Sequence, residues 1–141
     1  VPQPRQRRRR VLLPPLGGAN DLSRSDKHLT HVVVHLGTNG TYTLKMCRRL
    51  VRSAGPTRTV YLVTVKVPRA WEDVNNLTMR RCAEKFRNDR VVLVDWNSVA
   101  SKNPEFLYAD GYHLRPEGAK AFARMVRKAI LTPRAPYFIL L

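Results

Sequence analysis

Three short apolar runs along the chain have the pattern of buried β-strands. They lie at residues 31–36, 59–65 and 91–95 and are rich in valine and other β-favouring residues. Apolar runs without alternating polar positions are typical of strands that are covered on both faces, as in parallel sheets. We therefore predict three parallel strands rather than an open antiparallel sheet.

Segments with helical periodicity separate and follow these runs. One covers residues 44–54 and is closed by Gly55-Pro56, and a second begins at Glu72 and extends to about Arg87. In the second helix we expect four side chains to face the core: Val74, Leu77, Cys82 and Phe86. The alternation of strands and helices predicts an α/β fold with a parallel sheet and flanking helices.

The last predicted helix has the clearest pattern. Pro116 suits its first turn. Its apolar positions follow the spacing i, i+3, i+4, i+7 and i+8, which makes one stripe that we expect to face the sheet: Phe122, Met125, Val126, Ala129 and Ile130.

Composition divides the 141 residues into three parts. Residues 1–30 are rich in Arg, Pro, Gly and Ser without a sustained period, so we interpret them as a basic, disordered arm. Residues 31–132 carry the predicted α/β domain, and residues 133–141 form a short apolar tail. No apolar run approaches the roughly 20 residues that a membrane helix needs. The apolar stretch after the Arg-rich start is too short and too interrupted by proline for a signal peptide.

The formal net charge of +16 is large for a chain of this length and could indicate a polyanionic partner. Only seven of the 26 Lys and Arg residues lie in the first 30 positions, so the excess is spread along the chain. Neither a zinc-finger spacing nor an RRM signature is present. We therefore interpret the charge as a solvated surface, suited to an anionic polymer of the cell envelope, and do not favour nucleic acid as a partner.

The cysteines and two of the histidines do not have the pattern of a metal site. Cys47 and Cys82 are too few for a disulfide framework or a four-ligand zinc site, and we interpret them as buried thiols. His31 and His35 share one face of the first predicted strand, but no Cys, Asp or Glu cluster accompanies them. We favour packing or hydrogen bonding for both histidines. We predict no metal and no cofactor.

Three loops carry polar residues where the predicted strands end. Gly37-Thr38-Asn39-Gly40 follows the first strand, and Pro68-Arg69-Ala70-Trp71 follows the second. Asp110-Gly111-Tyr112-His113 lies between the third strand and the last helix. Ligands of such sheets bind in the crevice beyond the carboxyl ends of the strands. We therefore expect the three loops to converge there.

The spacing of Asp110 and His113 predicts a catalytic pair. On a turn, the carboxylate can accept the Nδ1 proton of the imidazole and leave Nε2 free as a base. The alternative for the bare spacing is a helix-terminal turn in which both residues cap backbone groups. Asn39 can donate its side-chain amide to an oxyanion, and Gly37 permits the tight turn before it. The alternative for this motif is an ordinary Asn-Gly turn.

Arg69 and Trp71 are candidates for the wall of a substrate cleft, with the indole stacked on a sugar ring. Trp71 is equally well explained as a hydrophobic anchor for the helix that follows it. We expect Trp96 to lie in the core.

Longer segments around these motifs resemble the SGNH family of esterases and acyltransferases. The segments are HVVVHLGTNG at 31–40, VKVPRAWE at 65–72 and YADGYHLRPEGA at 108–119, and they look like the SGNH domains of peptidoglycan O-acetyltransferases. Arg115 departs from the pattern, because a small capping residue is preferred before a helix. The resemblance covers about 31–130 and implies a flavodoxin-like three-layer α/β fold.

The resemblance implies acetyl transfer or acetyl-ester hydrolysis on a cell-wall polysaccharide through an acyl-enzyme. Asp110 and His113 would be the catalytic pair, and Asn39 and Gly37 would form the oxyanion hole. The resemblance also implies an acetylated or acetyl-accepting glycan as the partner, an extracytoplasmic or cell-envelope location, and an upstream membrane domain that donates the acyl group.

The Gly-Asp-Ser block that carries the family's nucleophile does not occur in the 141 residues. Ser23 and Ser25 lack both a buried strand before them and an adequate helix after them. The chain before Gly37 is too short for two strands with their crossovers, since one strand-helix-strand unit takes about 30 residues. We therefore expect an α/β domain without its first strands, with impaired catalysis and an apolar edge at 31–36 that favours self-association. The alternative is a non-catalytic remnant that serves as a basic binding or interaction module.

Overall fold

The three predicted strands form one parallel sheet. In this computed structural model, which describes residues 29–87 and 90–133, the sheet order is β1-β2-β3. The strands are β1 (His31–Val34), β2 (Thr59–Val63) and β3 (Val91–Val94), and both pairings are parallel. The prediction of an α/β fold with a parallel sheet is confirmed, and each strand ends one or two residues earlier than expected.

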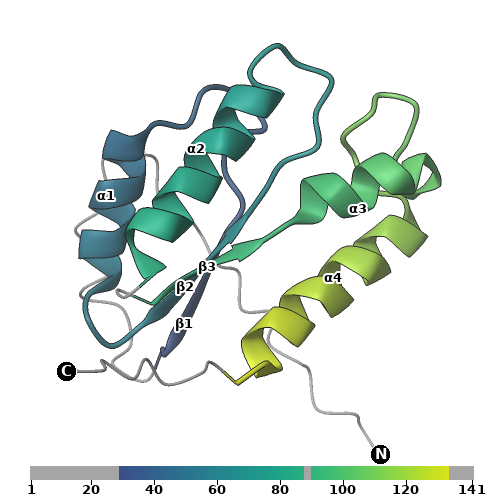
Figure 1. Cartoon of the computed structure of the whole chain (residues 1–141). Coiled ribbons are helices and arrows are strands. Elements are labelled where there is room, and N and C mark those ends of the chain that lie inside the picture. The colour runs from purple at the N-terminus through teal and green to yellow at the C-terminus, as the bar shows by residue number, and fades with distance from the viewer. Residues whose placement is uncertain (1–28, 88–89, 134–141) are drawn as a thin grey trace, which may run out of the picture.

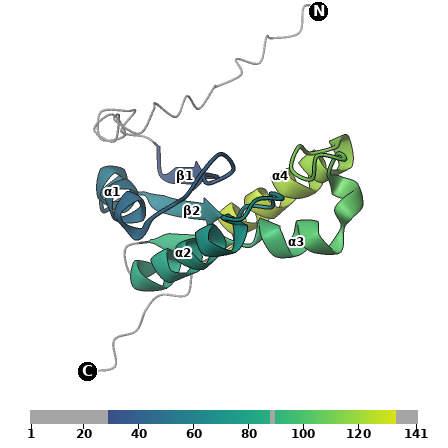
Figure 2. The same cartoon turned by 90° about the horizontal axis from the view of Figure 1, so that it is seen from above.

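The helices lie on both sides of the sheet. Figure 1 shows α1 and α2 together on one side and α3 and α4 on the other, and Figure 2 shows the same arrangement from above. Their bounds are α1 (Leu44–Ala54), α2 (Glu72–Lys85), α3 (Trp96–Lys102), the short 3-10 helix η2 (Pro104–Phe106) and α4 (Pro116–Leu131). The sequence analysis did not predict α3 and η2, because such short helices have too few positions to show a period.

The two faces of the sheet bury different halves of each strand, since successive side chains point to opposite faces. Val34, Val60 and Leu62 pack with α1 and α2, whereas Tyr61 and Val63 pack with α3 and α4. Trp96 is 1% exposed, so its predicted place in the core is confirmed. The whole predicted stripe of α4 packs on this second core, which also confirms the orientation of that helix.

The predicted buried face of α2 was wrong in part. Val74 and Leu77 are exposed, at 59% and 48% of their surfaces, whereas Cys82 is buried and Phe86 packs against the core. The helix instead turns Asn75 and Asn76 inward, and both side chains hydrogen-bond to backbone groups of neighbouring loops. Those hydrogen bonds set the rotation of the helix, and a count of apolar positions could not show them.

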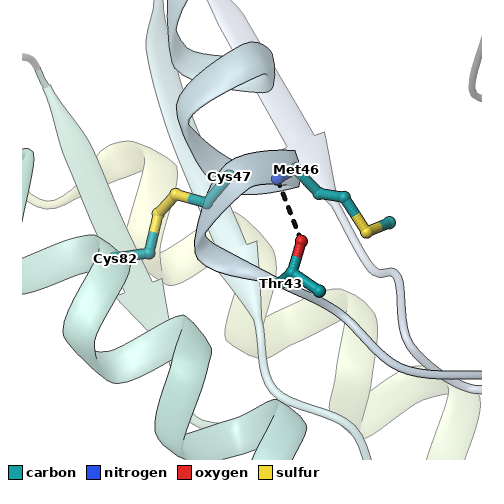
Figure 3. The surroundings of a disulfide bond; sticks show 4 residues. All are labelled: Thr43, Met46, Cys47 and Cys82. Carbon is teal, nitrogen blue, oxygen red and sulfur yellow. Dashed lines mark hydrogen bonds between the residues drawn. A yellow bond between two sulfur atoms is a disulfide. The ribbon is translucent and has the colours of Figure 1, made fainter.

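The two cysteines are buried as predicted, but they are not free thiols. Cys47 on α1 and Cys82 on α2 are buried and form a disulfide, which Figure 3 shows between the two helices. Their Cα atoms are 6.3 Å apart, within the range that a disulfide requires. The sequence does not reveal this pairing, because 35 positions separate the two cysteines and only the packing of α1 on α2 brings them together.

His31 of β1 and His35, which directly follows that strand, make ring contacts on the α3 and α4 side of the sheet. His31 stacks on Tyr61 at a centroid distance of 5.8 Å, and His35 packs against Phe122 at 5.2 Å. Burial lowers the pKa of His35. The preference for packing over metal ligation agrees with these contacts.

β1 lies at one edge of the sheet and pairs only with β2 within the described residues. No helix among residues 29–87 and 90–133 is long and apolar enough to span a bilayer. The proposed basic arm, with Ser23 and Ser25, and nearly all of the apolar tail lie outside the described residues.

Candidate active site

A cleft of about 200 Å³ lies beyond the carboxyl ends of β1 and β2. The three loops that sequence analysis identified all contribute to it. Its lining residues are Thr38, Asn39, Val67, Arg69, Trp71 and Tyr112. Three of these, Asn39, Arg69 and Trp71, were predicted as site residues.

The loop after β1 approaches α2 very closely. Gly37 has a φ of +99°, and a Cβ at this position would lie 2.7 Å from Nδ2 of Asn75. Only glycine meets both conditions without strain. The carbonyl oxygen of Gly37 points toward α2 and accepts hydrogen bonds from Nε1 of Trp71 at 3.1 Å and from Nδ2 of Asn75 at 3.0 Å. The role of Gly37 in an oxyanion hole stays a prediction.

The loop after β2 is fixed by the start of α2. The carboxylate of Glu72 accepts a hydrogen bond from the backbone N–H of Val67 and forms an ion pair with Nζ of Lys66 at 3.0 Å. Trp71 is half-buried, and its indole lines the cleft while its N–H binds the neighbouring loop. Trp71 therefore lines the cleft and links it to the loop after β1, and its role toward a substrate stays a prediction.

Asp110 and His113 form a hydrogen-bonded pair on an exposed turn. Nδ1 of His113 lies 2.6 Å from Oδ2 of Asp110. An ionised carboxylate can only accept, so Nδ1 of His113 carries a proton, and in the neutral imidazole the lone pair is then on Nε2. The other oxygen, Oδ1, accepts from the backbone N–H groups of Tyr112 and His113, each at 3.0 Å. The aspartate thus both caps the turn and orients the imidazole, while the catalytic role of the pair stays a prediction.

The backbone N–H of Tyr112, followed by the side chain and backbone of His113, lowers the pKa of Asp110 to about 2. Asp110 is therefore ionised throughout the neutral range. A permanent negative charge beside Nδ1 stabilises the imidazolium that forms when Nε2 accepts a proton. The pair has the electrostatics that a general base requires.

Tyr112 connects the pair to the cleft. Its ring lines the cleft, and the ring centroid lies 4.2 Å from that of His113. Asp110 and His113 themselves do not line the cleft and lie beside it. Arg115 is the N-cap residue of α4, and its side chain makes no capping hydrogen bond. This agrees with the expectation that a small capping residue is preferred at this position.

Sequence reasoning missed Thr38, Tyr112 and Asn75 as parts of this region. Thr38 and Tyr112 lie within the motifs, but the spacing of the motif residues does not indicate a role for either side chain. A signal for Asn75 was present, since two adjacent asparagines interrupt the apolar face of a predicted helix. Within residues 29–87 and 90–133, no cluster of three or more His, Cys, Asp or Glu side chains is placed to hold a metal ion.

No family model matches the chain. Several curated proteins are similar to it over its last two-thirds, and two of them illustrate the match. O-acetyltransferase OatA of Staphylococcus aureus (strain NCTC 8325 / PS 47) is 40% identical over 101 residues, which are 72% of this chain and 16% of that protein. YrhL of Bacillus subtilis (strain 168), named as a candidate peptidoglycan O-acetyltransferase, is 37% identical over 99 residues, 70% of this chain and 15% of that protein. The chain thus spans less than a fifth of the length of these relatives, and about 70% of it is homologous to part of bacterial O-acetyltransferases.

Proposed function

We propose that residues 31–130 form the back part of an SGNH-type acyl-transfer site that acts on O-acetyl groups of cell-wall polysaccharide. The observation that carries the proposal is the Asp110–His113 pair at 2.6 Å, adjacent through Tyr112 to the cleft that Asn39 lines. The names of the homologous O-acetyltransferases support the acetyl group and, through YrhL, the glycan.

The proposed chemistry assigns one role to each group. Nε2 of His113 takes the proton of a serine hydroxyl as its oxygen bonds to the acetyl carbonyl carbon. Asn39 donates to the oxyanion of the resulting tetrahedral intermediate. When the intermediate collapses, the bond from carbon to the sugar oxygen breaks, and that oxygen receives the proton from Nε2. A sugar hydroxyl or water then removes the acetyl group from the serine by the reverse sequence.

The cleft wall has a chemistry that suits a peptidoglycan strand. The indole of Trp71 and the phenol of Tyr112 offer ring faces on which sugars can stack. Arg69 is exposed in the same cleft, and its guanidinium can bind the carboxylates that peptidoglycan carries. The disulfide supports an extracytoplasmic location, because disulfides persist in oxidising compartments.

The nucleophile is the part of the mechanism that residues 1–141 do not supply in recognisable form, since no Gly-Asp-Ser occurs in them. A serine from outside these residues would complete the site. Alone, the 141-residue chain should hydrolyse acetyl esters at close to the background rate, because a His–Asp pair without a nucleophile can only activate water.

The test measures p-nitrophenyl acetate hydrolysis by the purified chain, followed by NMR titration with O-acetylated muropeptides. We expect weak hydrolysis without a burst, lowered further in His113→Ala and in Asn39→Ala. Added muropeptide should shift the resonances of Asn39, Trp71 and Tyr112.

Two results would contradict the proposal in different ways. If His113→Ala and Asn39→Ala match the parent rate and muropeptide shifts no cleft resonance, the site assignment is wrong. A burst that Ser23→Ala or Ser25→Ala abolishes would instead show that the nucleophile lies in the first 30 residues.

A second candidate function, an interaction module, is favoured by the edge of the sheet. β1 has an open edge within the described residues, and an apolar groove beside it is lined mainly by Val33, Phe122, Val126 and Ile130. Unpaired strand edges bind other strands. We propose that two copies associate through β1, as the sequence analysis anticipated.

Sedimentation velocity over a range of concentrations tests this second candidate. The parent chain should associate, and Val33→Lys should remain monomeric because a charge then occupies the groove. Leu77→Lys is the control, since it places the same charge on an exposed apolar residue of α2, outside the groove. A parent chain that stays monomeric at about 100 μM, or equal association of both variants, would exclude pairing through β1.

A further inference from the structure

Two adjacent asparagines of α2 are buried where the helix packs against the loops of the cleft. Asn75 is 0% exposed and Asn76 is 5% exposed. A buried amide is costly unless its hydrogen bonds are made. Both amides make theirs with backbone groups, so each is positioned by specific partners.

The two side chains hold different loops. Nδ2 of Asn75 donates to the carbonyl oxygens of Gly37 at 3.0 Å and Gly40 at 2.7 Å, and Oδ1 accepts from the N–H of Tyr42 at 2.7 Å. Asn76 instead bonds to both backbone groups of Val65, accepting from its N–H at 2.8 Å and donating to its carbonyl at 2.9 Å.

Asn75 therefore closes the 37–42 loop at three points that surround Asn39. Trp71 adds a fourth bond, from its Nε1 to the carbonyl of Gly37 at 3.1 Å. Asn39 itself is exposed, and within the described residues its side chain makes no hydrogen bond of its own. The position of Asn39 over the cleft is consequently set by the backbone on either side of it, which α2 holds.

We infer that Asn75 is a positioning residue, which fixes the loop so that Asn39 presents its amide to the cleft. The inference rests on the proposed function, in which Asn39 stabilises an oxyanion. Such a donor is effective only when it is preorganised, so that no reorganisation is needed during the reaction. Asn75 would supply that preorganisation without touching the substrate.

The test compares Asn75→Asp with Asn76→Asp by 15N-labelled NMR spectra. Each change keeps the size of the side chain and its Oδ1 acceptor and removes the amide donor. Both variants remove a buried donor on the same helix, so both should be destabilised, and their melting temperatures are measured alongside.

Asn75→Asp should shift the backbone amides of Thr38, Asn39 and Gly40 and the side-chain amide of Asn39. Asn76→Asp should leave these four signals in place and shift Val65 and its neighbours. Trp71→Phe is a milder variant for the case in which Asn75→Asp does not fold. It deletes the Nε1 donor to Gly37 together with part of the ring system, leaves the bonds of Asn75 in place, and should shift the same loop amides by a smaller amount.

The inference is overturned if the Asn39 signals keep their parental positions in the folded Asn75→Asp or Trp71→Phe variant, or if Asn76→Asp shifts them equally. The hydrolysis rate of Asn39→Ala answers the separate question of the proposed function. If that rate equals the parent rate while Asn75→Asp displaces the loop, Asn75 still positions Asn39 and the oxyanion role fails.

Discussion

The two sides of the cleft are built in opposite ways. On the Asn39 side, the buried Asn75 of α2 and the half-buried Trp71 at its N-cap bind loop backbone that lies 33 to 38 positions away in the sequence. On the His113 side, the loop at 108–115 is held by bonds between near neighbours, and the side chains of His113 and Asp110 are 64% and 41% exposed. One side depends on the tertiary fold, whereas the other depends mainly on its own turn.

This contrast predicts how each side responds to perturbation. A change that loosens the packing of α1 and α2 should displace Asn39 and leave the Asp110–His113 turn intact. A change within residues 106–118 should do the reverse. A reaction that needs both Asn39 and His113 would therefore be lost after either change. In the first case Asn39 is displaced, and in the second case His113 is displaced.

Loss of the disulfide should have the largest effect on stability. Closing a loop of 35 residues stabilises a fold by about 3–4 kcal/mol in the chain-entropy estimate, so Cys47→Ser with Cys82→Ser should lower the free energy of unfolding by about that amount. Urea denaturation measures it. Reductant should destabilise the parent and leave the double variant unchanged. If reductant does not move the parent midpoint, the cysteines are not bonded in solution.

Gly118→Ala should be the next largest change, and it acts on the His113 side. A Cβ at Gly118 would lie 2.1 Å from the carbonyl oxygen of Phe106, which accepts a hydrogen bond from the N–H of Arg115. Overpacking of this kind costs about 1–3 kcal/mol. The first turn of α4 should move away from η2 and carry the 108–115 loop with it.

Gly40→Ala is the matched control on the Asn39 side. A Cβ there meets no atom within 4 Å, and Gly40 is outside the left-handed φ range. We expect its free energy of unfolding, measured in urea, to stay within about 0.5 kcal/mol of the parent value. If the two alanine variants are equally stable, the close approach of Gly118 to Phe106 is not present in solution.

The strands and the buried face of α4 could be predicted from the sequence because local patterns of apolar residues determine them. The β-branched runs predicted β1, β2 and β3, and the apolar stripe of α4 predicted which face of that helix is buried. The same reasoning failed for Val74 and Leu77, because the rotation of α2 depends on the hydrogen bonds that Asn75 and Asn76 make with distant backbone. Local apolar spacing contains no information about those partners.

The candidate site divides in the same way. The pairing of Asp110 with His113 follows from a three-residue spacing on a turn, so sequence could predict it. The link between Trp71, Asn75 and Gly37 joins positions more than 30 residues apart. The disulfide between Cys47 and Cys82 escaped prediction for the same reason.

The pH dependence of the His113 side gives a smaller, local test. The pKa of Asp110, about 2, lies below its ordinary value of 3.8, so its stabilising contribution is present above about pH 4 and is lost as the pH falls through 2. A 13C titration of the Asp110 carboxyl should show a midpoint near pH 2. Asp110→Asn should leave the 37–42 amides unshifted and lower the His113-dependent hydrolysis. A midpoint near pH 4 would mean that the turn does not hold the carboxylate.

Tyr42→Phe should have the smallest effect on stability, and it changes only the Asn39 side of the cleft. Tyr42 is 3% exposed, and its hydroxyl has no hydrogen-bond partner within the described residues, so burial raises its pKa to about 12. Phenylalanine removes this unsatisfied hydroxyl and keeps the backbone N–H that Asn75 binds. The free energy of unfolding should therefore stay the same or rise by up to about 1 kcal/mol, and the loop amides should keep their shifts. A loss above about 1 kcal/mol in urea would show that the hydroxyl is satisfied in solution. The 37–42 loop would then be held by a side-chain contact in addition to the backbone bonds of Asn75.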